Sequence, residues 1–267
     1  MKIFLGPAGS PGGKTLGAMK IVRELGLHSM ELAFGHGVTM GNETAKEVGR
    51  ENKKHGVRIS IHAPYYINLN SSDRKKVEDS KKRILDTCER AHHIGAKKVV
   101  FHSGYYHDDR KKAYGSICAG IAEVIDAIKR NRWDVELLPE TAGRVKQFGD
   151  LDEIIQISRE TGCSFCVDPA HIFARNNGKI DYEEMFDRLK ETKEKDLHFH
   201  FSGVAYSEKG EKHHLTLGDG GPDFKAFAEE LIARKRGATI ISESPVTWKD
   251  SLAMKKILEN LGHSFDR

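Results

Sequence analysis

The sequence has few cysteines and no long apolar run. Four cysteines among 267 residues are too few for a disulfide framework in a chain of this size, and they fit a reducing compartment. No stretch approaches the roughly 20 apolar residues of a membrane helix. The first residues, Met-Lys-Ile-Phe-Leu-Gly, form too short an apolar run for a signal peptide. We therefore expect a cytoplasmic protein that has no membrane partner.

The chain also lacks a strong charge bias and any sign of a second domain. Its net charge of +4 and pI near 8.7 tolerate a polyanionic partner but fall short of the pI above about 9 that marks a nucleic-acid-binding domain. Its length is close to the roughly 250 residues of a (β/α)8 barrel. We expect residues 1–267 to form a single domain and to act as a monomer.

A unit of helix end, strand and polar residue recurs along the chain. Apolar helical patterns end at glycine, the residue preferred in a left-handed helix cap, and a β-rich run follows each one. These glycines are Gly26, Gly56, Gly95, Gly162 and Gly237. The predicted strands lie near residues 2–5, 28–34, 57–62, 97–102, 134–140, 164–168, 196–201 and 238–243. Alternating strands and helices indicate a parallel sheet, and we predict a closed (β/α)8 TIM barrel.

Residues that can bind metals stand where six of these strands end. They are His62, His102, Glu140, Asp168, His200 and Glu243. Such strand ends meet on one rim if the sheet closes into a barrel, whereas an open doubly wound sheet spreads them along a crevice. Imidazoles together with carboxylates suit zinc, manganese or iron better than calcium or magnesium. The pattern predicts a metal centre at the C-terminal rim, and clustered metals of this kind favour phosphodiester hydrolysis.

Five segments resemble motifs of the endonuclease IV family of apurinic/apyrimidinic-site endonucleases, in the order of that family. They are residues 61–70 (Ile-His-Ala-Pro-Tyr-Tyr-Ile-Asn-Leu-Asn), 101–104 (Phe-His-Ser-Gly), 138–143 (Leu-Pro-Glu-Thr-Ala-Gly), 166–171 (Cys-Val-Asp-Pro-Ala-His) and 242–245 (Ser-Glu-Ser-Pro). The resemblance implies a barrel with three Zn²⁺ ions, Mn²⁺ being the alternative metal. It also implies incision of double-stranded DNA on the 5′ side of an abasic site.

The resemblance assigns roles to individual residues. His62, His102 and Glu140 would hold the first zinc, Glu140 would bridge to a second zinc completed by Asp168, His200 and Glu243, and His171 would hold the third. Glu140 and Glu243 would act in catalysis, while Tyr65 and Asn68 would contact the substrate. His198 shares a strand face with His200, and we favour His200 because it lies nearer the end of the strand.

Two segments depart from the family pattern. Aligning Leu-Gly-Asp-Gly at 217–220 makes His214 the ligand histidine but puts Lys212 at the family's aspartate, and a charged lysine cannot bind a metal. Glu211 with His214 is one replacement, Glu211 with His213 is another, and a weak or absent third metal is the remaining alternative. The loop at 33–40, after the second strand, lacks the arginine with which the family penetrates DNA.

Other activities fit parts of the pattern. Sugar isomerases and epimerases with xylose-isomerase-like barrels use a smaller set, which Glu140, Asp168, His200 and Glu243 would supply. Such an enzyme has little use for the additional histidines, so we rank it second. A DNA-binding repair accessory without catalysis would not need an intact ligand set.

Several shorter signals have structural explanations. Residues 8–15 nearly reproduce a P-loop, but no later strand ends in the magnesium-binding aspartate of a nucleotide fold, so we expect a rim loop. Cys163 and Cys166 have redox or zinc spacing, and we expect both to be buried in the core. Glu31 is either a further rim group or part of a salt bridge. The basic runs at 74–76, 81–83 and 110–112 are either phosphate contacts or solvated helix faces.

Overall fold

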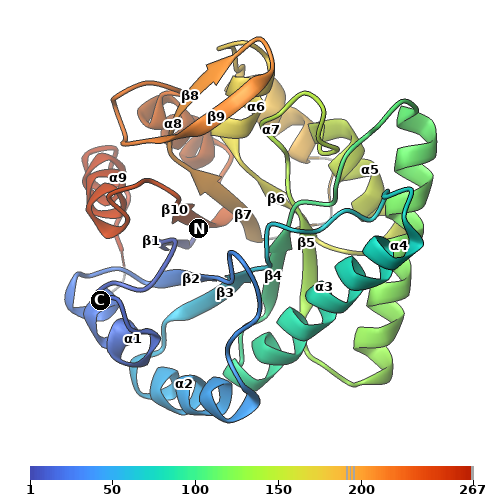
Figure 1. Cartoon of the computed structure of the whole chain (residues 1–267). Coiled ribbons are helices and arrows are strands. Elements are labelled where there is room, and N and C mark those ends of the chain that lie inside the picture. The colour runs from blue at the N-terminus through green and yellow to red at the C-terminus, as the bar shows by residue number, and fades with distance from the viewer. Residues whose placement is uncertain (191, 193, 195, 266–267) are drawn as a thin grey trace.

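The computed structural model describes residues 1–190, 192, 194 and 196–265. Its described part contains eight parallel strands that form a central barrel surrounded by helices (Figure 1). The barrel strands are β1 (Ile3–Pro7), β2 (Ser29–Ala33), β3 (Arg58–His62), β4 (Lys98–Phe101), β5 (Glu136–Pro139), β6 (Cys166–Val167), β7 (Asp196–Phe201) and β10 (Gly237–Ser242). Each predicted strand overlaps one of these, and the predicted TIM barrel is confirmed.

Backbone pairing closes the barrel. The strands form two parallel sheets, in the orders β1-β10-β7-β6 and β2-β3-β4-β5. Isolated parallel bridges from Ala8 to Glu31 and from Glu140 to Cys166 join the two sheets at both seams. At the first seam β1 and β2 approach so closely that a Cβ on Gly6 would lie 1.6 Å from the Ser29 carbonyl oxygen. Glycine is therefore required at position 6 for the two strands to meet.

The helices lie outside the barrel and connect its strands. They are α1 (Thr15–Glu24), α2 (Asn42–His55), α3 (Arg74–Ile94), α4 (Arg110–Arg130), α5 (Leu151–Thr161), α6 (Pro169–Arg175), α7 (Tyr182–Lys190), α8 (Phe224–Ala233) and α9 (Trp248–Asn260). Among the described residues, none of these helices combines the length and apolar character that crossing a bilayer requires.

Four of the five predicted helix-ending glycines behave as expected. Gly56, Gly95 and Gly162 have positive φ angles directly after α2, α3 and α5, and Gly26 has one two residues after the end of α1. The prediction for Gly237 is wrong, because α8 ends earlier and Gly237 is the first residue of β10. The chain reverses instead through Lys235, which has a φ of 53°.

The alternation of side chains along β7 separates the core from the barrel interior. Phe199 and Phe201 point toward the helices, where their rings lie 5.0 and 5.2 Å from the ring of Phe227 on α8. His198 and His200 occupy the intervening positions, so they point into the barrel. The outward phenylalanines therefore bury apolar surface against the helices, whereas the inward histidines bring polar nitrogen atoms into the barrel.

A hairpin that the sequence analysis did not predict follows β7. Strands β8 (Gly203–Ser207) and β9 (Gly210–Leu215) pair antiparallel and lie beside α6 in Figure 1. Val204 on the hairpin packs with Ala170 and Ala174 of α6. The ring of Tyr206 meets that of Phe173 at 5.5 Å, edge to face. The hairpin is thus fixed against the helix that begins with the Asp-Pro-Ala-His segment.

The P-loop-like segment does not have the conformation of a P-loop. A P-loop leads directly into a helix, whose first backbone N–H groups bind the phosphates. Here Leu16 and Gly17 have non-helical dihedral angles at the start of α1, so the regular helix begins only after them. This supports the prediction of a rim loop.

Candidate metal centre

Glu140 lies at the centre of the rim residues. Its side chain is fully buried directly after β5. One carboxylate oxygen, Oε2, lies 3.2 Å from His62 Nε2 and 3.5 Å from His102 Nε2. The other, Oε1, lies 2.9 Å from His200 Nδ1 and 3.3 Å from His171 Nδ1. The two oxygens thus face different pairs of histidines, the arrangement of a bridging carboxylate.

The first group of potential ligands consists of His62, His102 and Glu140. Their ligand atoms lie within 4.8 Å of one another. His62 Nδ1 is 2.7 Å from the carbonyl oxygen of Ala63, and donation there leaves Nε2 available on the side of Glu140. The backbone therefore fixes the ring of His62 in the tautomer that can bind a metal.

The second group consists of Glu140, Asp168, His171 and Glu243. Asp168 Oδ1 caps α6 by accepting from the backbone N–H groups of Ala170 and His171, at 2.7 and 3.2 Å. Its other oxygen, Oδ2, is buried and accepts no hydrogen bond within the described chain. A buried carboxylate oxygen that accepts no hydrogen bond is costly, and the nearest cationic group within that part of the chain is His171 Nδ1 at 3.5 Å. A carboxylate oxygen of Asp168 lies within 4.8 Å of ligand atoms of Glu140, His171 and Glu243, which fits a cation at that position.

The third group consists of His171, Glu211 and His214. Glu211 Oε2 lies 3.5 Å from His171 Nε2, and Glu211 Oε1 lies 3.9 Å from His214 Nε2. The β8–β9 hairpin contains a bulge, because Ala205 pairs with His213 whereas Tyr206 pairs with Glu211.

The bulge explains which histidine faces inward. Residues two apart share a face in a regular strand, but one extra residue moves the shared position to three apart. Lys212 is that extra residue, so Glu211 and His214 lie together while Lys212 and His213 are exposed. Of the three alternatives that the sequence leaves open, the structure brings together Glu211 and His214.

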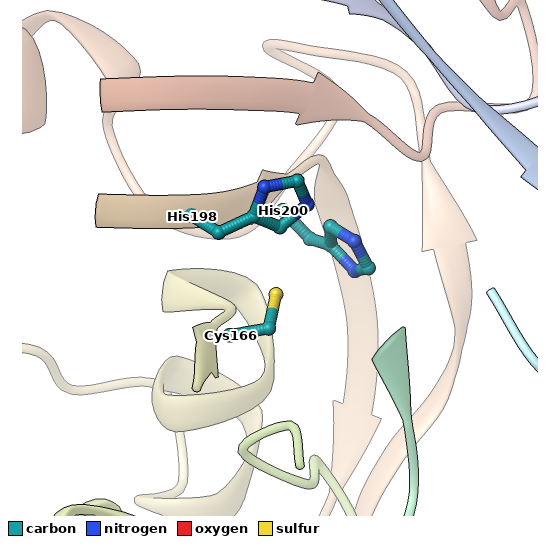
Figure 2. A group of neighbouring side chains, drawn as sticks. All are labelled: Cys166, His198 and His200. Atoms are coloured by element: carbon teal, nitrogen blue, oxygen red, sulfur yellow. The ribbon is translucent and has the colours of Figure 1, made fainter. Parts of the chain in front are cut away.

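A fourth, deeper group lies below the rim. Figure 2 shows His198 and His200 projecting from β7 and the thiol of Cys166 pointing toward them from β6. Burial raises the pKa of Cys166 well above its usual range, so the group is a neutral thiol rather than a thiolate ligand. Cys163 and Cys166 are both buried, as predicted. The sequence analysis did not foresee that Cys166 would lie beside the two histidines.

His200 and His198 have different neighbours. His200 Nδ1 faces Glu140 and also lies 3.4 Å from Glu243 Oε1. His198 Nε2 instead lies 3.1 Å from Glu31 Oε2, and burial lowers the pKa of His198 to about 4. His200 is thus the histidine that reaches the rim group, and Glu31 is paired with histidines in the barrel interior.

The charges of the centre are strongly coupled. Burial alone would lower the pKa of His62, but the hydrogen bond and charge of Glu140 raise it to about 9. Burial lowers the pKa of His102 to about 4. The pKa of Glu140 is well below its usual range because the charges of His102 and His200 outweigh its burial. The ionised carboxylate of Glu140 therefore faces the protonated imidazole of His62, which must lose its extra proton when a metal binds.

The two predicted substrate contacts differ in position. The side chain of Tyr65 is 61% exposed and its ring lies 6.2 Å from that of His62, so it stands at the mouth of the centre. Asn68 Oδ1 accepts a hydrogen bond from the backbone N–H of Asn70 at 3.1 Å, so this oxygen is engaged within its own loop. Sequence reasoning missed three further exposed tyrosines: Tyr66 and Tyr105, which follow β3 and β4, and Tyr206 in the hairpin strand β8.

Comparisons with known proteins agree with this architecture. Residues 19–261 match the family model described as xylose isomerase-like TIM barrel. The chain is 35% identical over 255 residues to an uncharacterized protein of Methanocaldococcus jannaschii, covering 91% of this chain and 92% of that protein. It is 31% identical over 194 residues to the probable endonuclease 4 of Mycobacterium leprae, covering 70% of this chain and 72% of that protein.

Solved structures share the fold over nearly the whole chain. A D-tagatose 3-epimerase-like protein has a TM-score of 0.75 at 18% identity, covering 97% of this chain and 96% of that one. Endonuclease IV from Thermus thermophilus has a TM-score of 0.71 at 16% identity, covering 97% of this chain and 98% of that one. At these identities the likeness shows the fold alone. By its family match and its sequence relatives, the chain belongs to the xylose isomerase-like TIM barrel family, in the group that includes the probable endonuclease 4 proteins.

Proposed function

We propose that the protein is a metal-dependent endonuclease that hydrolyses the DNA phosphodiester on the 5′ side of an abasic site. The observation that carries this proposal is the presence of three adjacent ligand groups, two of which share Glu140. Phosphodiester hydrolysis uses such clustered sites. The relatedness to probable endonuclease 4 proteins supports DNA as the substrate.

The residues suggest how the metals would be held. The first would lie among His62, His102 and Glu140, and the third among His171, Glu211 and His214. For the second, the family resemblance gives Glu140, Asp168, His200 and Glu243. His200 Nδ1 lies 2.9 Å from Glu140 Oε1 and 3.4 Å from Glu243 Oε1, and His171 is clustered with the three carboxylates. Bound Zn²⁺ or Mn²⁺ supplies Lewis-acid activation of water and stabilises charge on the attacking and leaving oxygens. Glu140 would hold two of these sites in fixed relation. Glu243, a member of the second group, lies close to the third, with its Oε2 3.6 Å from His214 Nε2.

The surface around the centre offers features that suit a nucleic acid. The exposed tyrosines at 65, 66 and 105 follow barrel strands and Tyr206 lies in the hairpin strand β8, and aromatic rings can stack on unpaired bases. Basic side chains at the first turns of α3 and α4, including Arg74, Lys76 and Lys111, are exposed on the same side. These groups would position the phosphate backbone next to the metal centre.

The run at residues 81–83 is a poorer candidate for DNA binding. Lys81 forms ion pairs with Glu78 and Glu123, at 2.8 and 2.6 Å, and Lys82 pairs with Asp86 at 2.6 Å. These partners neutralise the charges along the middle of α3. We therefore place the phosphate contacts at the helix starts.

The test is incision of a duplex that carries one tetrahydrofuran abasic analogue. The analogue cannot undergo β-elimination, so cleavage would require hydrolysis. We expect a single cut that leaves a 3′-hydroxyl, no cut in an undamaged duplex of the same sequence, and loss of activity after strong chelation. A metal-loaded protein that leaves this duplex intact would refute the proposal.

A sugar epimerase is the second candidate, favoured by the structural likeness to a D-tagatose 3-epimerase-like protein. Glu140, Asp168, His200 and Glu243 would be sufficient for that chemistry. The metal content separates the two functions, because the endonuclease requires about three ions per chain and the epimerase about one. Epimerisation of a ketose by a protein with one bound metal would favour this second candidate.

A further inference from the structure

A buried carboxylate lies directly below the proposed metal centre. Glu31 is fully buried at the inner face of β2. Its Oε1 lies 2.9 Å from His200 Nε2. Its Oε2 lies 3.1 Å from His198 Nε2 and accepts a hydrogen bond from Ser60 Oγ at 2.7 Å. Glu31 thus connects three strands across the barrel interior.

His200 has a carboxylate at each ring nitrogen. Its Nδ1 faces Glu140 and Glu243, at 2.9 and 3.4 Å, whereas its Nε2 faces Glu31. A metal-binding imidazole is neutral and carries a single proton. If this proton is on Nε2, it faces the Glu31 carboxylate, which lies at ion-pair distance without the geometry of a hydrogen bond, and the lone pair of Nδ1 points at the second ligand group.

We propose that Glu31 is a positioning residue that fixes His200 in the tautomer and orientation needed to bind the second metal, and that His198 and Ser60 hold Glu31 in place. This inference rests on the proposed metal centre. It assigns different roles to the two histidines of β7. His200 would bind the metal, and His198 would donate a hydrogen bond to Glu31.

Direct ligation of a metal by Glu31 is the competing role, and it would have to displace the contacts of Oε2. Its Oε2 accepts a hydrogen bond from Ser60 Oγ at 2.7 Å and faces His198 Nε2 at 3.1 Å. Its Oε1 accepts no hydrogen bond from the described residues, and ligand atoms of Glu31, His200 and Glu243 lie within 4.8 Å of one another. Moving a buried carboxylate to the rim would leave the donors to Oε2 unpaired, and that is costly. Cys166 lies beside the same histidines (Figure 2), but as a neutral thiol it does not replace a carboxylate acceptor.

The test is metal retention in Glu31→Gln, which keeps the size of the side chain but replaces one acceptor oxygen with an amide. Wild type and variant are dialysed against a graded chelator, and bound metal is measured by elemental analysis. We expect the variant to lose one metal per chain at a chelator concentration about 10–100-fold lower than wild type requires, and to retain the others. Cys163→Ala is the control, because Cys163 is also buried but belongs to none of the potential ligand groups of the described residues.

A second pair of variants separates positioning from a general structural role. His198→Gln can still donate to Glu31, whereas His198→Leu cannot. We expect the leucine variant to lose the same metal and the glutamine variant to keep it. Wild-type retention in Glu31→Gln would overturn the inference. If that variant fails to fold, equal retention in the two His198 variants would overturn it.

The proposed function and this inference can fail separately. Metal retention is measured without substrate, so a wild-type protein that holds three metals but does not cut abasic DNA would refute the endonuclease while leaving the role of Glu31 testable in the same dialysis. Conversely, an active endonuclease whose Glu31→Gln variant holds its metals normally would refute only the role of Glu31.

Discussion

The most direct prediction concerns Glu140→Gln. The substitution preserves shape but removes a charge that four imidazoles approach within 3.5 Å. Removing one partner of a buried charged pair costs about 3–5 kcal/mol. If that energy is lost from metal binding or from the transition state, it corresponds to about 10²–10⁴-fold. We expect the incision rate to fall by this factor and the metal content to fall with it.

The assay is single-turnover cleavage of the tetrahydrofuran duplex, together with elemental analysis of the same sample. Glu136→Gln is the matched control, because Glu136 is exposed at the opposite end of the same strand, β5. This control should keep its metals and its rate. A Glu140→Gln variant with full metal content and a rate within tenfold of wild type would refute a bridging role for Glu140.

Two further predictions follow from the geometry. Glu211→Ala and His214→Ala should each remove about one metal per chain, as measured by elemental analysis. His213→Ala, on the exposed face of the hairpin, should remove none. Equal metal loss in all three variants would contradict the role assigned to the bulge. The metal-free protein should be most stable near pH 6.5, as judged by its unfolding temperature from pH 4 to 9.5 in chelator. The pKa of His62 is raised to about 9, so this group adds stability that is lost as pH rises from 6.5 toward 9. The pKa of His102 is lowered to about 4, so this group removes stability as pH falls from 6.5 toward 4. Each contribution to the free energy of unfolding is on the order of 3 kcal/mol. A stability that rises steadily with pH across this range would contradict the assignment.

The barrel was predictable because its signals are local. A glycine after a helical pattern permits a left-handed cap without strain, and this preference depends only on the local sequence. Gly56, Gly95 and Gly162 show this, each with a positive φ. Gly237 was misassigned because the reversal occurs two residues earlier, at Lys235. A non-glycine residue with positive φ leaves no local signal, since its conformation is imposed by the docking of α8 and β10.

The depth of a residue within the barrel was harder to predict. A period of two places His198 and His200 on one face of β7, but it does not say which of them lies level with Glu140. That depends on the alignment of neighbouring strands, in which His198 is the partner of Cys166 and His200 the partner of Ile241. The pairing of Glu31 with both histidines depends on the same alignment, so the sequence left its role open.

The third ligand group shows how a change in spacing can be compensated by the backbone. In the family pattern Lys212 stands at the position of an aspartate, and a bulge brings the preceding Glu211 to one face with His214. We propose that Glu211 serves in place of that aspartate. The β8–β9 hairpin must also approach the barrel closely, and Gly143 permits this approach. A Cβ at that position would lie 2.7 Å from Glu211 Cβ and 3.0 Å from His171 Cδ2. The backbone N–H of Glu211 then donates to the Gly143 carbonyl oxygen at 3.0 Å. The glycine of the Glu-Thr-Ala-Gly segment thus links Glu140, at its start, to a hairpin some 70 residues later in the chain, and the bulge and the glycine together keep a carboxylate beside His171 despite the lysine.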